Sequence, residues 1–277
     1  MGCIYKISEG MADFTDTESR LANYILDHKD EATLSSAQQL GERAGVSASA
    51  VTRFAHRLGY SGFTALKLDL ARDHAEEVSN FDDMIKETDS TLDVIRKAEA
   101  LSTRLQNQAY RLLDVESLQH AVDVLLHCRT IYLFGISGSG IVCMDLMEKL
   151  SRIDRRVIYH QDFHDQLAAT AHISSRDAAL AISYGGKTHE VNTAMQYAKE
   201  RGASTIAVTQ FRKSPLTRYA DTLLYIPTTE RELRLGAIAS RNASLIVTDM
   251  LYMCMVKNDV ARTNESLVKT RELIERL

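Results

Sequence analysis

Residues 130–140 read Thr-Ile-Tyr-Leu-Phe-Gly-Ile-Ser-Gly-Ser-Gly, and this stretch decides the fold. Its first five residues are rich in β-branched and aromatic side chains, which favour a strand, and glycine and serine form the turn that follows. A helical pattern comes next, with apolar residues on one face at Val142, Leu146, Met147 and Leu150. Glycines let the backbone approach a ligand, and the N–H groups and dipole at a helix start favour negative charge. We therefore expect this turn to bind a phosphate.

Strand and helix patterns alternate from residue 130 onward. Strands are predicted at 130–134, 156–159, 178–183, 204–209 and 222–226. Helices are predicted at 138–151, 164–172, 188–201, 215–220 and 240–258. Some strands are continuous apolar runs, such as 178–182, which is typical of a parallel sheet buried on both faces. This predicts a doubly wound, flavodoxin-like α/β domain with five parallel strands, whose ligands bind at the carboxyl ends of the strands.

A second glycine-rich turn follows the third predicted strand, where residues 182–190 read Ile-Ser-Tyr-Gly-Gly-Lys-Thr-His-Glu. Two such turns at the same edge of one sheet would converge on a single phosphate site. The residues expected to bind the ligand are Ser137, Gly138, Ser139, Ser183, Tyr184, Gly186, Lys187 and Thr188. Neither turn has the spacing of a nucleotide triphosphate loop, and Ser137 interrupts the GxGxxG pattern. The alternative is that both are tight turns in a domain without a ligand.

Residues 36–58 carry the spacing of a helix-turn-helix. Ser36 caps the first helix, Gly45 suits the left-handed residue that ends it, and Ser47 caps the second helix. One face of the second helix is apolar, with Val51, Phe54, Ala55 and Leu58. In this motif the second helix enters the major groove of DNA. We therefore predict an all-α domain that binds double-stranded operator DNA.

The exposed face of the second helix carries small hydroxyl residues and two arginines. Hydroxyl groups reach phosphates and base edges, and arginine clamps phosphate or reads guanine. The residues predicted to contact DNA are Ser36, Ser47, Ser49, Thr52, Arg53, His56 and Arg57. The alternative is a helical hairpin with a solvated polar face, because any glycine between two helices imitates this pattern.

Composition limits the remaining classes of protein. The net charge of −4 argues against a surface that is basic overall and binds nucleic acid nonspecifically, but it is compatible with a local DNA-binding surface. There is no run of about 18 apolar residues and no signal-peptide pattern, so we expect a cytoplasmic protein without a membrane span. The four cysteines, Cys3, Cys128, Cys143 and Cys254, lie far apart, which indicates reduced thiols and no metal site. No cofactor is predicted.

An acidic, weakly periodic stretch at residues 78–90 has the character of a linker. It divides the chain into a helix-turn-helix domain at 1–77 and a second domain at 91–277. Helical patterns at 91–127 precede the first strand, and these helices either cover the sheet or pair with another subunit.

The two halves together resemble bacterial transcription regulators of the RpiR family, which join an N-terminal helix-turn-helix domain to a C-terminal sugar isomerase (SIS) domain. The resemblance is carried by residues 45–54, 58–63, 135–139, 182–186, 240–243 and 248–249. It implies that a sugar phosphate is the effector and shifts DNA affinity. It also implies dimers or tetramers built through the SIS domain.

The resemblance further implies roles for single residues. Ser139 and Ser183 match serines that look like phosphate ligands in this family. Ser137 stands where glycine is common, and Gly185 stands where the second turn usually has another serine. Losing that hydroxyl removes one donor, which is worth on the order of 1 kcal/mol or more if the phosphate is buried. Ser137 or Lys187 would compensate.

SIS domains also occur in aldose–ketose isomerases and lyases, whose chemistry needs a general base beside the carbon that loses its proton. His164 and Glu232 match family positions close to the sugar, although an exposed helix-cap histidine and a surface ion pair are equally good explanations. Glu190 and His189 are bases by type, but the sequence shows no nucleophile–base pair. A dedicated DNA-binding domain favours a sensor, because binding alone can shift a two-state dimer.

The sequence thus predicts a DNA-binding transcriptional regulator, acting as a repressor, that is not an enzyme. The resemblance implies that a phosphorylated sugar bound in the SIS domain controls its DNA affinity. The alternatives are a sugar-phosphate isomerase or lyase with an accessory helical domain, and a helical protein–protein module on a nucleotide-binding domain.

Overall fold

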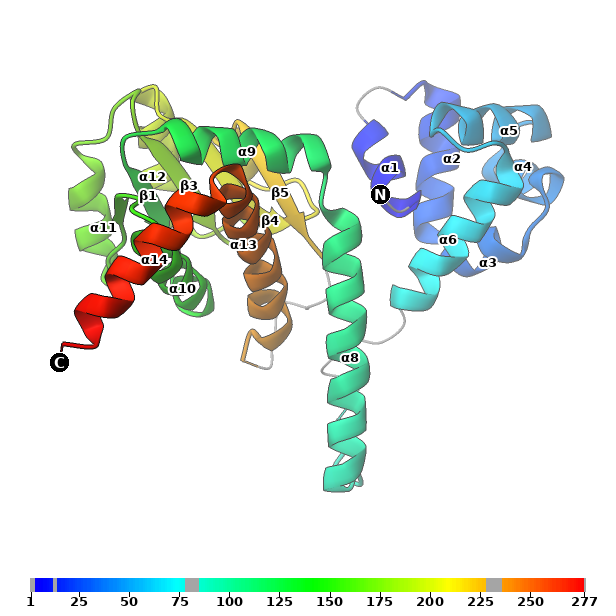
Figure 1. Ribbon diagram of the computed structural model, residues 1–277. Coiled ribbons are helices and arrows are strands. Elements are labelled where there is room, and N and C mark those ends of the chain that lie inside the picture. The colour runs from blue at the N-terminus through cyan, green and yellow to red at the C-terminus, as the bar shows by residue number, and fades with distance from the viewer. Residues whose placement is uncertain (1–2, 12–13, 78–84, 228–235, 277) are drawn as a thin grey trace. The chain divides into compact units, whose positions relative to one another are not determined.

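The computed structural model describes residues 3–11, 14–77, 85–227 and 236–276. The chain divides into two compact units, Met1–Met84 and Ile85–Leu277, which we call the N-terminal and C-terminal units (Figure 1). Each unit has a buried apolar core of its own. No helix in the described ranges is long and apolar enough to cross a membrane.

The N-terminal unit is helical throughout its described elements. These are α1 (Cys3–Gly10), α2 (Asp16–Asp27), α3 (Lys29–Leu34), α4 (Ala37–Ala44), α5 (Ala48–Arg57) and α6 (Phe63–Glu77). The predicted caps of the helix-turn-helix are confirmed. Ser36 accepts the N–H of Gln39 at the start of α4, and Ser47 accepts the N–H of Ala50 at the start of α5. Gly45 ends α4 in the left-handed region at φ 67°, so the turn between the helices needs this glycine.

The core of the N-terminal unit buries the apolar face of α5 against α2 and α6. The four residues predicted on that face are at most 9% exposed: Val51, Phe54, Ala55 and Leu58. Helix α1, which the sequence pattern does not predict, adds Cys3 and Ile7 to this core. The opposite face of α5 is therefore left for solvent or a ligand.

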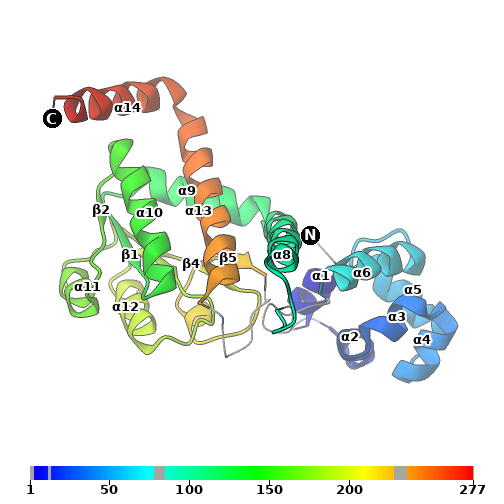
Figure 2. The same cartoon turned by 90° about the horizontal axis from the view of Figure 1, so that it is seen from below.

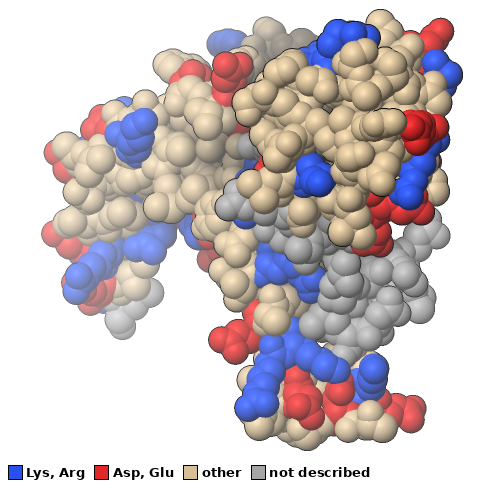
Figure 3. Space-filling model, turned by 90° about the vertical axis from the view of Figure 1, so that its right-hand side faces the viewer, with Lys and Arg blue, Asp and Glu red and all other residues tan. Residues whose placement is uncertain are grey.

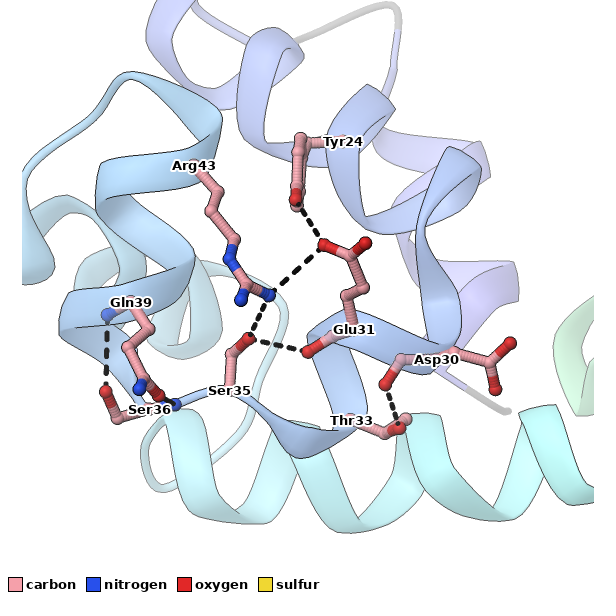
Figure 4. A network of polar contacts seen from close by, with 8 residues as sticks. All are labelled: Tyr24, Asp30, Glu31, Thr33, Ser35, Ser36, Gln39 and Arg43. Carbon is pink, nitrogen blue, oxygen red and sulfur yellow. Dashed lines mark hydrogen bonds and ion pairs between the residues drawn. The ribbon is translucent and has the colours of Figure 1, made fainter.

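A polar network joins the helices that precede the turn (Figure 4). Tyr24 of α2 donates to the Glu31 carboxylate of α3 over 2.9 Å, and Arg43 of α4 donates to it over 3.1 Å. Arg43 also donates to Ser35 Oγ, which donates in turn to the Glu31 carbonyl over 2.6 Å. Because Arg43 and Glu31 are about half exposed, their ion pair adds little stability. The network links α4 to α2 and α3 through side-chain hydrogen bonds.

The C-terminal unit is an α/β domain with one parallel sheet. Its elements are α8 (Thr91–Leu112), α9 (Val115–His127), β1 (Ile131–Phe134), α10 (Gly138–Arg152), β2 (Val157–Ile158), α11 (Phe163–Thr170), β3 (Ala178–Ile182), α12 (His189–Glu200), β4 (Ser204–Gln210), the 3-10 helix η1 (Leu216–Arg218), β5 (Thr222–Ile226), α13 (Ile238–Asn258) and α14 (Val260–Ile274). The strand order is β2-β1-β3-β4-β5, and every neighbouring pair is parallel. The predicted flavodoxin-like, doubly wound fold is confirmed.

Helices cover both faces of this sheet (Figures 1 and 2). One face, with Leu133 and Leu180, packs against α9, α10, α13 and the end of α8. The other face, with Phe134 and Ala181, packs against α11, α12 and η1. Every residue of β1 and β3 is buried, which is why their sequences are continuously apolar rather than alternating.

The sequence leaves open whether the helices before the first strand cover the sheet or pair with another subunit. Helix α9 and the C-terminal end of α8 cover the sheet, since Ala109, Val122 and Leu125 are buried in its core. The N-terminal half of α8 extends away from the sheet (Figure 1). Leu92 and Ile95 in that half are 54% and 58% exposed, so the sheet does not cover them.

Some boundaries differ from the sequence predictions. The strand predicted at 156–159 shortens to Val157–Ile158, because it lies at the edge of the sheet and pairs with the short β1. The helix predicted at 215–220 is the single 3-10 turn of η1. Helix α14 is not predicted by the sequence pattern, because Thr263 is its one buried residue within the described chain and no apolar stripe marks it.

Candidate functional site

The two glycine-rich turns lie side by side at the carboxyl edge of the sheet. They follow β1 and β3, which are neighbours even though β2 lies between them in the sequence. Successive connections run to opposite faces of the sheet at this point, which opens a crevice in doubly wound folds. We call residues 135–138 the first loop and residues 183–188 the second loop. The predicted convergence of the two turns rests on this strand order.

The first loop depends on close backbone approach. A Cβ at Gly135 would lie 2.7 Å from Cys143 Sγ, and one at Gly140 would lie 2.6 Å from Tyr159 Oη. Ser137 occupies φ 55° and ψ −126°, a region that favours glycine. Its side chain does not cap α10. Among the described residues, the N–H groups of Gly138 and Gly140 donate no hydrogen bond and are available to an anion.

The second loop is held more firmly by its surroundings. Gly186 lies at φ 60°, and its carbonyl accepts the N–H of Leu216 over 3.1 Å. The Ser183 and Thr188 hydroxyls are 3.4 Å apart, so both point into the same small region. A Cβ at Gly185 would meet no atom of the described residues within 4 Å, so there is space for the missing serine at this place.

Three helices that begin at this edge lack a side-chain cap, whereas α11, which follows β2 at the same edge, is capped by Asp162. The N-cap residues of α10, α12 and α13 are Ser137, Thr188 and Ala237, and none of their side chains accepts a hydrogen bond from its helix. The other α-helices of the C-terminal unit, α8, α9, α11 and α14, are capped by a serine or aspartate side chain. A Cβ at Gly138 would lie 3.3 Å from Ala237 Cβ, which places the starts of α10 and α13 together. The N–H groups at these starts can therefore serve an anion.

The structure places most of the residues predicted to bind the effector around these loops. Ser139 is half-buried in the first turn of α10, Ser183 is buried at the end of β3, and Lys187 is exposed. His164 is exposed in the first turn of α11, where Asp162 caps the helix. Glu232 lies outside the described residues. Tyr184 is 6% exposed and its side chain packs in the sheet core, so it contributes its backbone to the surface of the second loop.

Three polar residues beside the loops are absent from the set predicted from sequence. The Tyr159 hydroxyl donates to the Gly135 carbonyl over 3.4 Å, and burial raises the pKa of Tyr159 to about 12. The side-chain NH2 group of Gln166 donates to the Gly135 carbonyl, and that of Asn192 donates to the Gly186 carbonyl. No short sequence motif marks Tyr159 or Asn192. Gln166 lies with Asp162 and His164 in a segment that resembles the family pattern, but its contact with Gly135 is made through the tertiary fold.

Six of the seven residues predicted to contact DNA lie in α5 or at its N-cap, whereas Ser36 caps the start of α4. Ser47 and Ser49 are exposed, and their hydroxyls lie 2.9 Å apart. Arg57 pairs with Glu18 of α2 over 2.5 Å, and Thr52 donates to the Ala48 carbonyl. His56 Nδ1 lies 3.1 Å from the Tyr60 carbonyl, at the end of α5. Arg53 is exposed, and its side chain makes no hydrogen bond or ion pair within the described chain.

The described residues on the face shown in Figure 3 do not form a broad basic patch. Acidic residues outnumber basic ones in residues 1–77. On the face shown in Figure 3, lysine and arginine side chains stand among aspartate and glutamate side chains.

Replacing Ser137 by glycine is expected to stabilise the C-terminal unit by about 1 kcal/mol, because the backbone strain at this residue disappears. Thermal denaturation should show a melting temperature raised by about 2–4 °C. Ser151→Gly is the matched control, because Ser151 is exposed near the C-terminal end of the same helix. This variant should lower the melting temperature, since glycine weakens a helix. Equal destabilisation by both changes would contradict the strain at Ser137.

Comparison with known proteins matches both units of the chain. The family model described as "Helix-turn-helix domain, rpiR family" matches residues 1–77, and the model described as "SIS domain" matches residues 124–254. An uncharacterised HTH-type transcriptional regulator of Caldanaerobacter subterraneus is 34% identical over 263 residues, which cover 94% of this chain and 93% of that protein. A similar regulator of Providencia stuartii is 29% identical over 265 residues and covers the same shares.

A solved structure similar over the whole chain is the Vibrio vulnificus NanR protein complexed with ManNAc-6P. Its TM-score is 0.63 at 23% identity, and the match covers 99% of this chain and 98% of that one. The sugar isomerase domain of an RpiR transcription factor from Sphaerobacter thermophilus has a TM-score of 0.59 at 20% identity and covers 66% of this chain and 99% of that one. At these identities the two structures support the fold. The 34% identity over nearly the full length shows in addition that this chain belongs to the RpiR family of HTH-type transcriptional regulators with a C-terminal SIS domain.

Proposed function

We propose that this regulator binds operator DNA through α5 and that a phosphorylated sugar, bound at the carboxyl edge of β1 and β3, controls its DNA affinity. One observation carries the proposal. Two neighbouring loops open onto helices α10 and α12, whose first N–H groups have no side-chain cap. Such helix starts favour a dianion such as a phosphate monoester. The same chain carries a helix-turn-helix whose reading face is exposed.

The phosphate would be held by hydroxyl and backbone donors from both loops. Ser139, Ser183 and Thr188 supply hydroxyls, and Lys187 adds positive charge nearby. Helix dipoles from α10 and α12 add to the attraction. The sugar would then extend toward His164 at the start of α11. The NanR structure contains ManNAc-6P, and a hexose phosphate of the same chemical class suits this site.

We further propose that the protein senses the sugar phosphate rather than converting it. Isomerisation needs a base placed beside the reacting carbon. Of the candidate bases, His164 and Glu190 are both exposed in the first turns of their helices. Binding is sufficient for regulation if the ligand prefers one of two states, and its differential affinity sets the size of the effect. The active form would be a cytoplasmic homodimer or homotetramer assembled through the SIS domain, and the protein would act as a repressor.

The decisive experiment is a gel shift on the DNA upstream of the gene, with and without a panel of hexose and amino-sugar phosphates. We expect specific binding that one or a few sugar phosphates change, with no turnover of these compounds. Absence of binding to any nearby DNA, together with turnover of a hexose phosphate, would sink the proposal and favour an isomerase.

Replacing Arg53 by alanine is expected to weaken operator binding by about tenfold or more, because a phosphate or guanine contact is lost. Sugar-phosphate affinity, measured by calorimetry, should stay unchanged. Arg201→Ala, an exposed position at the end of α12, changes the net charge equally and serves as the control. Equal weakening of DNA binding by both variants would argue that only overall charge matters.

A further inference from the structure

Gln166 ties the first loop to the segment that follows β2. Its side-chain Nε2 donates to the Gly135 carbonyl over 3.2 Å and to the His160 carbonyl over 2.7 Å. The side chain comes from α11 and is 2% exposed. Since both neighbours are carbonyl oxygens, the amide must present its NH2 group to them, which fixes its orientation. Its Oε1 is buried and accepts no hydrogen bond from the described residues.

Asn192 stands in the same relation to the second loop. It belongs to the first turn of α12 and is 9% exposed. Its Nδ2 donates to the Gly186 carbonyl over 3.3 Å, and its Oδ1 is buried without a partner among the described residues. Each loop thus has one buried amide behind it that donates to a loop glycine and leaves its own oxygen unused.

This shared arrangement indicates that the two amides orient the loops rather than stabilise the fold. A buried amide whose oxygen is unpaired gains little net free energy from its remaining hydrogen bonds. The bonds nevertheless fix the direction of each glycine carbonyl, and therefore of the adjacent peptide groups. Gly135 leads into Ser137 and the start of α10, and Gly186 lies between Ser183 and Thr188. The two amides therefore orient the backbone groups that would bind the anion, from the side of each loop that faces the protein interior.

We infer that Gln166 and Asn192 are the positioning residues of the effector site: each fixes one anion-binding loop and so sets anion affinity without touching the anion. The inference rests on the proposed function, because it assumes that the two loops hold a phosphate. It deepens that function by assigning the preorganisation of the site to one amide on each side of the crevice.

The test uses the full-length protein and inorganic phosphate as the probe, with calorimetry well below the melting temperature. Gln166→Met and Asn192→Leu keep most of the side-chain volume but remove the donors. Each is expected to weaken phosphate binding by about tenfold, a typical effect of one hydrogen bond that orients a site. Gln196→Met is the control, because Gln196 is exposed on the same helix as Asn192 and donates to Glu200 over 2.9 Å. It should bind phosphate as the wild type does.

Hydrogen exchange separates positioning from general loosening. The two variants should exchange faster in the peptides that cover residues 135–140 and 183–188, respectively, and not in β4. Faster exchange throughout the C-terminal unit would overturn the inference. If a variant does not fold, Gln166→Asn and Asn192→Ser replace it, since each shortens the side chain and is expected to give the same loss.

Ser183→Ala distinguishes failure of the inference from failure of the proposed function. If this variant loses phosphate while Gln166→Met and Asn192→Leu bind within twofold of the wild type, the inference fails and the proposed function stands. If the wild type binds neither inorganic phosphate nor any sugar phosphate, or if Ser183→Ala binds as well as the wild type, both fail.

Discussion

Replacing Gly186 by alanine is expected to destabilise the C-terminal unit by several kcal/mol. Gly186 lies at φ 60°, where a residue with a side chain costs about 1–3 kcal/mol. A Cβ there would lie 2.7 Å from Ser214 Cβ and closer still to Ser214 Oγ. Overpacking of this kind costs about 1–3 kcal/mol more. Either the second loop or the segment that carries Ser214 would therefore have to shift.

The neighbouring glycine provides the matched control for this prediction. Gly185→Ala should change stability by less than about 0.5 kcal/mol, because a Cβ there meets nothing within 4 Å in the described chain. Urea denaturation of the purified protein measures both variants. Adding Ser214→Gly to Gly186→Ala should restore part of the loss, since it removes the clash but not the backbone strain. If Gly185→Ala and Gly186→Ala were equally stable, the close packing of Gly186 against Ser214 would be wrong.

Replacing Ser139 and Ser183 together by alanine is expected to abolish the response to the sugar phosphate and leave DNA binding intact. A hydrogen bond to a charged group contributes about 1.5–3 kcal/mol. Two such losses amount to at least a hundredfold in affinity, since each 1.4 kcal/mol is about tenfold. Ser183 is 4% exposed, so water would not easily replace its hydroxyl.

Titration of the operator complex with the effector found in the gel-shift panel measures this loss. Ser151→Ala, which lies on α10 like Ser139 but away from the first loop, is the control and should respond normally. The single variants should each show a smaller shift of the response. A double variant that responds at the same concentration as the wild type would mean that the phosphate is held elsewhere.

Local signals in the sequence predict the recognition helix well. A serine cap, a left-handed glycine and an apolar face all act within a few residues, and the structure confirms them at Ser36, Gly45 and Ser47. The sequence does not show which side chains are already paired within the fold. Arg57 looks like Arg53 in the sequence, yet it pairs with Glu18, which lies 39 residues away. That pairing depends on how α2 packs against α5, so only the three-dimensional arrangement separates the two arginines.

The candidate effector site shows the same division. The glycine- and serine-rich loops are visible in the sequence because backbone approach and helix starts need those residue types locally. Their surroundings are not visible. Tyr184 carries a hydroxyl and is therefore a reasonable ligand by type, but the fold buries its side chain in the core. Gln166 reaches Gly135 across 31 residues, and no periodicity reports such a contact.

The sequence by itself determined the two-part organisation, the helix-turn-helix, the parallel sheet and the two loops, because caps, turns and apolar runs are properties of neighbouring residues. The tertiary structure alone decided that β1 and β3 are adjacent, that Ser137 takes a backbone conformation suited to glycine, and that two buried amides hold the loops. These features depend on strand order and on packing between distant segments. Local propensity does not encode such contacts, which form only when the whole sheet assembles.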